Sequence, residues 1–179
     1  MGLATFIGGI HPFEGKELSE DKPIKYLEPL QGEVMVYPLS QHIGAPAKPL
    51  VAKGDHVLKG QIIAADPTSI AEAGGFISAN VLSSVSGTVK GIESKLVANG
   101  AMVQSILVEN DGEEEAIEGF GTDRDATKLS KEEIRQIVKD AGIVGLGGAG
   151  FPTNVKLSPK NEDAIEYILI NGAECEPYL

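Results

Sequence analysis

A dense group of glycines lies in residues 145–156, which read GLGGAGFPTNVK. Glycine lets a backbone approach a ligand closely or adopt positive φ. Gly145, Gly147 and Gly150 satisfy the spacing G-x-G-x-x-G, and Lys156 follows six residues after the last of them. A lysine at that distance could neutralise a phosphate as a point charge. The stretch is therefore either an elaborate turn or a cradle for a flat, phosphorylated ligand.

The context of these glycines excludes two common phosphate loops. A dinucleotide fingerprint needs a strand before it and a helix after it. Here the strongest predicted helix comes before, and Pro152 and Pro159 leave room for only a short helical turn after. A P-loop is excluded because the Gly-Lys-Ser/Thr ending is missing. What remains is a loop whose backbone amides could face a phosphate or a flat ring.

A second polar stretch, NGAECEP, occupies residues 171–177 and follows the apolar end of residues 163–170. We expect that run to be a buried strand of a parallel sheet. Ligands of open α/β sheets bind outside the carboxyl ends of the strands. Asn171 could contact a flavin edge or a ribose, while Glu174 and Glu176 could orient ribose hydroxyls, repel an anion or bind a divalent metal. The alternative is a polar turn, and two glutamates without a third ligand are weak evidence for a metal.

The elements that must position the glycines begin with a helix predicted over residues 130–141. Ser130 and Glu133 have the spacing of a capping box, and Leu129 with Ile134 that of a hydrophobic staple. Gly142 is placed to end the helix in a left-handed cap. One apolar face follows from the helical spacing of Ile134, Ile137, Val138 and Ala141.

Residues 31–110 have the pattern of a small all-β sandwich or barrel, with short apolar runs separated by glycine or proline. The expected strands are residues 33–37, 56–58, 61–64, 87–92 and 104–109. Residues 51–64 and 83–92 resemble the two half-motifs of biotinyl/lipoyl-type domains. The tip between them, residues 66–76, contains no lysine. We therefore expect no attached lipoate or biotin, and solvated scaffold lysines at Lys53, Lys59 and Lys90.

The net charge, the length of the apolar runs and the cysteine and histidine content exclude several classes of function. The net charge of −11 argues against a nucleic-acid or anionic-membrane binder, and no apolar run reaches the roughly 20 residues of a membrane span. The single cysteine, Cys175, excludes an intrachain disulfide and fits a small buried residue in a reducing cytoplasm. No metal site is expected, because His11, His42 and His56 have no partners at metal-ligand spacing.

We expect three regions: an irregular segment over residues 1–30, a β domain over 31–125, and the opening part of an α/β domain over 126–179. The acidic stretch 110–128 is expected to be a solvated linker or loop at the boundary. The end of the chain soon after a strand-like run leads us to expect a piece of a longer protein.

The two polar motifs together resemble a known family. GLGGAGFPTNVK is similar to the flavin loop of the NADH-binding subunit of respiratory complex I, and NGAECEP to its strand-end motif. With the lipoyl-like region before them, the chain is identified as a member of the RnfC family of the Rnf electron-transport complex. The implied fold is mixed: a lipoyl/biotinyl-like β-sandwich (a barrel-sandwich hybrid), then the start of an α/β flavin- and NADH-binding domain.

The resemblance implies a peripheral subunit on the cytoplasmic side of the membrane. It would pass electrons between NADH and ferredoxin through FMN and 4Fe-4S clusters, coupled to ion transport, with other subunits of the complex as partners. Gly145, Gly147, Gly148 and Gly150 would cradle the flavin and nicotinamide. Phe151 would help shape the NADH site, and Glu174 and Glu176 would line its pocket. Lys156 would hold the FMN phosphate, and Asn171 would contact the flavin. The flavin performs the hydride chemistry, so no catalytic acid or base is assigned.

Two departures from the family pattern are Leu146, in place of arginine, and Asn154, in place of glycine. The rest of the family's flavin domain and its four-cysteine cluster motifs are absent from these residues, so we expect no firmly bound cofactor and no activity from this chain alone. One rival hypothesis is a non-catalytic scaffold whose β domain docks partner subunits. A carrier domain with a swinging arm is disfavoured by the missing hairpin lysine.

Overall fold

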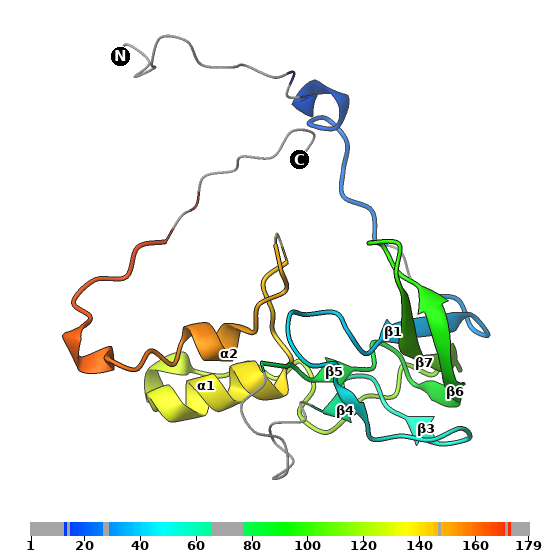
Figure 1. The fold of residues 1–179 in the computed structure, drawn as a ribbon. Helices are drawn as coiled ribbons and strands as arrows, with labels where there is room; N and C mark the ends of the chain where they lie inside the picture. The colour runs from blue at the N-terminus through cyan, green and yellow to red at the C-terminus, as the bar shows by residue number, and fades with distance from the viewer. Residues whose placement is uncertain are drawn as a thin grey trace. The chain divides into compact units, whose positions relative to one another are not determined.

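The computed structural model describes residues 13, 15–26, 29–65, 77–146, 148–170 and 172. The chain divides into two compact units. One is Pro29–Glu162, and the other combines Met1–Glu28 with Asp163–Leu179. Figure 1 shows that the first unit holds the strands and the two α-helices.

Two antiparallel sheets form most of the larger unit. One has four strands in the order β1-β7-β6-β3, and the other has three in the order β2-β4-β5. β6 and β7 make the longest pairing, with a register shift between Val89 and Gly91. The strands are β1 (Val34–Pro38), β2 (Lys48–Pro49), β3 (His56–Val57), β4 (Ile62–Ala65), β5 (Val81–Leu82), β6 (Gly87–Leu96) and β7 (Met102–Asn110).

The hydrophobic core draws side chains from both sheets. Val89, Ile106 and Val108 come from the four-stranded sheet, and Ile63 and Val81 from the three-stranded one. All five are buried and belong to one cluster. The two sheets therefore share a single core, as in a β-sandwich.

The five strands expected from the sequence are confirmed, each within a few residues of its predicted bounds. β2 and β5 were not predicted. Each contains two residues, which show no alternating pattern, and neither follows a Gly-Asp turn like the one that precedes the equally short strand β3. Both pair with β4, which lies between them.

Helical elements follow the β-sandwich in the same unit. They are a 3₁₀ turn η3 (Ala126–Lys128), helix α1 (Lys131–Asp140) and helix α2 (Thr153–Lys156). The predicted helix is confirmed as α1, and the single turn expected between Pro152 and Pro159 is confirmed as α2. Arg135 of α1 donates through Nε to the Leu157 carbonyl at 2.6 Å and pairs with Glu162. These contacts hold α1 to the segment that follows α2.

The smaller unit contains little regular structure in its described residues. A 3₁₀ turn η1 (Lys16–Leu18) lies near its start, and η4 (Glu162–Ala164) crosses into it from the larger unit. The expected buried strand over residues 163–170 is wrong. Residues 165–170 form no strand, and Tyr167 and Leu169 are 82% and 95% exposed. A strand needs a neighbour for its backbone hydrogen bonds, and the described residues of this unit contain none.

None of the helices found in the described ranges has the length and apolar character that crossing a lipid bilayer requires.

Candidate functional site

Helix α1 ends directly before the glycine-rich segment. Its N-terminus has both halves of the predicted capping box: Ser130 Oγ accepts from the Glu133 amide at 3.2 Å, and Glu133 Oε2 accepts from the Ser130 amide at 2.7 Å. The Ser130 amide, and after it the Ser130 hydroxyl, which also donates to Glu133 Oε2, hold the pKa of the Glu133 carboxyl below its ordinary value. At the other end, Gly142 has φ 63°, as predicted for a left-handed cap.

The segment after Gly142 folds into a hairpin. Val144 and Pro152 form an antiparallel bridge. The Gly145 amide donates to the Phe151 carbonyl at 3.0 Å, and the Thr153 amide donates to the Ile143 carbonyl at 2.9 Å. We call residues 145–151 the glycine loop. Figure 1 shows this hairpin in orange, standing away from α1 and α2.

The glycines of this loop have different surroundings. A Cβ placed on Gly148 would meet nothing within 4 Å, so this glycine leaves open space beside the backbone. Gly150 is buried, with φ 64°, and faces the β domain at Gln41 and His42. Gly147 lies outside the described residues. The loop is therefore open to a ligand near Gly148 and closed at Gly150.

Lys156 brings a positive charge back to the base of the loop. A Cβ placed on Gly145 would lie 3.2 Å from Lys156 Nζ, and the same nitrogen lies 5.9 Å from the centroid of the Phe151 ring. Among the described residues, no carboxylate forms an ion pair with Lys156. An ammonium group at the base of a loop that has open glycine backbone at Gly148 supplies the charge and the amide donors that a phosphate site uses.

The second predicted motif cannot be placed beside the first. Asn171, Glu174, Cys175 and Glu176 all lie outside the described residues. The structure thus brings together Gly145, Phe151 and Lys156 from the predicted set. The assignment of the other members to a common site stays a prediction.

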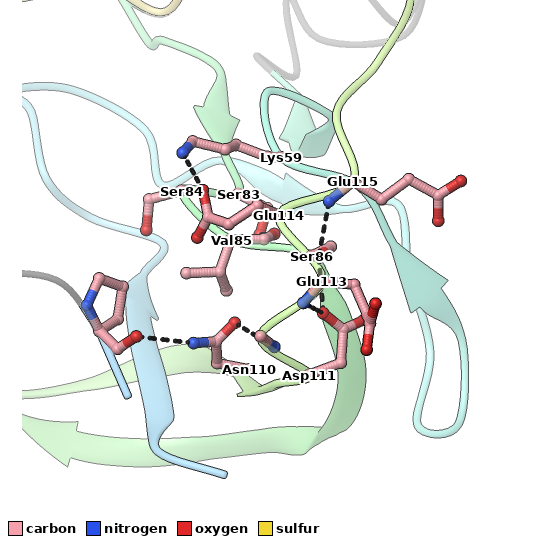
Figure 2. A network of polar contacts seen from close by, with 12 residues as sticks. Lys59, Ser83, Ser84, Val85, Ser86, Asn110, Asp111, Glu113, Glu114 and Glu115 are labelled. Carbon is pink, nitrogen blue, oxygen red and sulfur yellow. Dashed lines mark hydrogen bonds and ion pairs between the residues drawn. The ribbon is translucent and has the colours of Figure 1, made fainter. Parts of the chain in front are cut away.

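A separate network of polar contacts, which the sequence did not reveal, lies around Asp111 (Figure 2). Asp111 Oδ1 accepts from Ser86 Oγ at 2.6 Å and from the Glu113 amide at 2.9 Å. Asp111 Oδ2 lies 2.9 Å from His56 Nε2. The Ser86 hydroxyl, chiefly, and the Glu113 amide lower the pKa of Asp111 to about 2, with a smaller contribution from His56 and an opposing one from burial.

The Asp111 network has the residue types of a hydrolase triad without its arrangement. In a triad the histidine lies between the nucleophile and the carboxylate. Here the carboxylate lies between Ser86 and His56, and Ser86 is fully buried. Its hydroxyl also accepts from the Glu115 amide at 3.1 Å. The network therefore fixes backbone and offers no activated nucleophile.

The Asp111 network holds the first part of the acidic stretch, residues 111–117, on the β domain. The Lys59 amide donates to the Glu115 carbonyl at 2.9 Å, the Ile117 amide donates to the Lys59 carbonyl at 3.1 Å, and Lys59 Nζ pairs with Glu114 (Figure 2). The side chains of Glu113, Glu114 and Glu115 are exposed, as predicted, whereas that of Asp111 is partly buried. Of the two predicted alternatives, a solvated linker or a solvated loop, residues 111–117 form a loop, because their backbone is hydrogen-bonded to the β domain.

Both histidines and several lysines of the β domain have structural partners. His42 is buried and uses both ring nitrogens: Nε2 accepts from the Ala79 amide and Nδ1 faces the Ile43 carbonyl, both at 3.2 Å. Lys90 pairs with Glu109 at 3.0 Å. The described part of the chain contains no cluster of three or more His, Cys, Asp or Glu side chains that could hold a metal ion.

Two family models match the chain in succession. Residues 4–113 match the RnfC barrel sandwich hybrid domain, and residues 138–179 match the Nuo51 FMN-binding domain. The predicted fold class is confirmed: a barrel-sandwich hybrid β domain is followed by the beginning of a Nuo51-type FMN-binding domain.

Curated relatives align with nearly the whole chain. The C subunit of the proton-translocating ferredoxin:NAD⁺ oxidoreductase complex of Clostridium ljungdahlii is 43% identical over 177 residues, which are 99% of this chain and 37% of the relative. The C subunit of the Na⁺-translocating ferredoxin:NAD⁺ oxidoreductase complex of Acetobacterium woodii is 42% identical over 178 residues, which are 98% of this chain and 38% of the relative. The C subunit of the ion-translocating oxidoreductase complex of Rhodobacter capsulatus is 40% identical over 174 residues, which are 96% of this chain and 32% of the relative. The chain thus spans about a third of the length of these relatives.

Proposed function

The chain belongs to the RnfC family, and from this membership we propose that it forms part of the RnfC subunit of an ion-translocating ferredoxin:NAD⁺ oxidoreductase complex. The observation that carries the proposal is the succession of two matches on one chain, a barrel-sandwich domain and then the start of an FMN-binding domain. Relatives from such complexes align with 98% or more of the chain in two organisms. We propose the division at residues 1–30, 31–125 and 126–179 as the boundaries of its parts.

Within that subunit, we propose that the glycine loop and Lys156 belong to an FMN site. FMN supplies the hydride and electron chemistry when it is bound. The chain's own contribution is positional. Lys156 places an ammonium group beside Gly145, where it can hold a phosphate, and the open backbone at Gly148 lets a ligand approach. Phe151 carries the packing surface next to that lysine.

The remaining roles come from the family resemblance and complete the proposal. Asn171 contacts the flavin, Glu174 and Glu176 line the NADH pocket, and Gly147 and Gly150 join Gly145 and Gly148 in the cradle. Iron–sulfur clusters of the 4Fe-4S type, bound by cysteines in a longer polypeptide, connect FMN with ferredoxin. The subunit is peripheral, on the cytoplasmic side of the membrane, and touches other subunits of the complex.

A flavin titration tests this proposal. The polypeptide that contains these residues together with the rest of an RnfC subunit should bind FMN, and NADH should bleach the flavin absorbance. Lys156→Met should weaken FMN binding about tenfold, the loss of one charge-assisted contact, whereas Lys160→Met, at an exposed lysine that lies beyond α2, should not. The 179-residue chain alone should bind FMN weakly or not at all.

A non-catalytic scaffold remains the second candidate, because Gly142 and Gly150 both face β-domain backbone. In that case the loop connects two folded parts and no flavin binds. The same titration separates the two hypotheses. A longer subunit that carries no flavin and shows no spectral change with NADH would refute the FMN site and favour the scaffold.

A further inference from the structure

We propose that His42 is a positioning residue that joins two backbone segments of the β domain into one platform, and that this platform fixes both ends of the glycine loop. The platform consists of residues 41–45 and 77–80. The cofactor role of the loop rests on the proposed function, whereas the platform itself does not. Three features support the platform: the contact at Gly150, the contact at Gly142, and the link between them.

Gly150 marks the far end of the loop. Its φ of 64° lies in the left-handed region, which side chains other than glycine rarely adopt. A Cβ at this position would lie 2.8 Å from the Gln41 carbonyl oxygen and 2.9 Å from His42 Cα. The loop backbone therefore rests directly on the backbone of residues 41 and 42, and only glycine allows this approach.

Gly142 marks the near end of the loop and makes a second close approach. A Cβ there would lie 2.4 Å from the Asn80 carbonyl oxygen and 3.0 Å from Leu82 Cδ1, and φ is 63°. Asn80 Nδ2 also donates to the Lys139 carbonyl in the last turn of α1, at 3.2 Å. The near end of the loop is thus held on residue 80 while the far end is held on residues 41 and 42.

His42 connects these two contact points. Its Nε2 accepts a hydrogen bond from the Ala79 amide at 3.2 Å, and the Ala45 amide donates to the Ile77 carbonyl at 2.8 Å. Because a backbone amide can only donate, Nε2 must be the unprotonated nitrogen, and Nδ1 carries the proton that faces the Ile43 carbonyl. The imidazole therefore bridges the two segments.

Few side chains fill the space around these contacts. A cavity of about 280 Å³ lies between the platform and the turn after α1, with Tyr37, His42, Asn80 and Val144 among its lining residues. Side-chain packing beside this cavity is incomplete, so the two glycine contacts, the Asn80–Lys139 hydrogen bond and the His42 bridge carry the positioning. Loss of the bridge should release the loop without unfolding the β core.

Hydrogen exchange on the 179-residue chain tests the platform in the absence of any flavin. The reporters are the amides of Gly145 and Thr153, which close the hairpin, and the amide of Val89, which donates to the Asp55 carbonyl at 2.8 Å in the β domain. His42→Leu should speed exchange at Gly145 and Thr153 about tenfold and leave Val89 unchanged. His42→Gln should restore slow exchange, because its side-chain oxygen can accept the Ala79 amide.

The matched control is His56→Leu, which removes a histidine from the Asp111 network and should not affect the loop. Unchanged loop exchange in His42→Leu would overturn the proposal. Equal acceleration at Val89 would also overturn it, because the histidine would then support the whole domain. The proposal would also be overturned if His42→Gln failed to restore slow hydrogen exchange at the Gly145 and Thr153 amides.

A second pair of variants approaches the platform from the loop side. Gly150→Ala should accelerate exchange at Gly145 and Thr153 because its methyl group collides with the backbone of residues 41 and 42. Gly148→Ala, in open space, should not. Equal behaviour of the two variants would contradict the platform.

The outcome is separable from that of the proposed function. If the longer subunit binds no FMN while His42→Leu releases the loop, the FMN site fails and the platform stands. If FMN binds and the loop exchanges at the same rate in His42→Leu, the platform fails and the FMN site stands. If both hold, His42→Leu in the longer subunit should also lower the fraction of protein that retains flavin absorbance.

Discussion

Replacement of Asp111 by asparagine removes one charge from a network without changing the shape of the side chain. In the native chain this carboxylate accepts from the Ser86 hydroxyl and the Glu113 amide, and faces His56 Nε2. Asparagine keeps one oxygen for the first two donors, but it cannot offer them a negative charge. The expected result is a stable fold with a weaker hold on residues 111–117.

The pKa of Asp111 sets the size of the effect. It is lowered from 3.8 to about 2, and each unit corresponds to about 1.4 kcal/mol, so the upper bound is about 2.5 kcal/mol. The Asp111 and His56 side chains are 27% and 50% exposed, and solvent screening reduces such interactions. We expect Asp111→Asn to lower the free energy of unfolding by about 1–2 kcal/mol at pH 6.

The sign of the pH dependence follows from the same shift. A carboxyl with a lowered folded-state pKa stabilises the fold above its unfolded-state value, near 3.8, and this stabilisation is lost as the pH falls through about 2. The difference in unfolding free energy between the native chain and Asp111→Asn should therefore be constant from pH 6 to about pH 5. It should then shrink towards zero as the pH approaches 2.

Urea unfolding at a series of pH values measures this difference. Asp123→Asn is the matched control, because Asp123 is an exposed carboxylate on the same acidic stretch and should change the unfolding free energy by less than about 0.5 kcal/mol. An Asp111→Asn effect as small as the control would refute this account of the network. So would an effect that does not shrink on acidification.

Three further changes are expected to have measurable effects on thermal or urea unfolding. Ser130→Ala removes the cap that pairs with Glu133 and should cost about 1 kcal/mol, with a matching loss of helical circular dichroism. Gly44→Ala places a Cβ 1.9 Å from a backbone carbonyl oxygen and should cost clearly more than Gly32→Ala, which has a similar positive φ and open space; equal costs would contradict this. Arg135→Gln removes the pairing between α1 and the segment after α2 and should cost about 1–2 kcal/mol; an unchanged melting temperature would show that the pairing adds no stability.

Much of the β domain could be predicted because its longer strands carry an apolar pattern bounded by glycine or proline. The turns at Gly54 and Gly60 have φ of 97° and 83°, as such turn positions require. β2 and β5 escaped prediction because each is stabilised by pairing with β4, which no two-residue pattern reveals. Pairing of this kind is a tertiary property of the chain.

The apolar run at residues 165–170 shows the opposite failure. Its pattern fits a buried strand, yet Ile168 and Ile170 are 84% and 89% exposed. A pattern records which side chains favour burial and does not supply the surface that buries them. The Nuo51-type match continues through these residues, and relatives of this family are about three times as long as the chain. This supports the proposal that the chain forms part of a longer RnfC subunit.

The Asp111 network was missed because its members are far apart in sequence. Ser86 and Asp111 are 25 residues apart, and His56 and Asp111 are 55 apart. Read locally, the acidic run after residue 110 has the composition of a solvated linker. Its side chains do face solvent, but buried Ser86 and the backbone of Lys59 provide partners that composition alone does not show.

The glycines of residues 142–150 show how one residue type can serve two requirements in a single segment. Gly142 and Gly150 are held at positive φ against β-domain backbone, whereas Gly148 meets open space. The sequence motif counts Gly148 and Gly150 as parts of one cradle, because it records the absence of side chains and not what takes their place. If the ends of the loop are fixed by the platform, only the middle of the loop and Lys156 are free to meet a phosphate. The spacing of the glycines would then reflect the distance between two anchors on the β domain as much as the shape of a ligand. Substitutions of Gly142 or Gly150 should therefore speed hydrogen exchange at the loop amides and, as a consequence, weaken flavin binding. Substitutions of Lys156 should weaken flavin binding and leave hydrogen exchange in the loop unchanged.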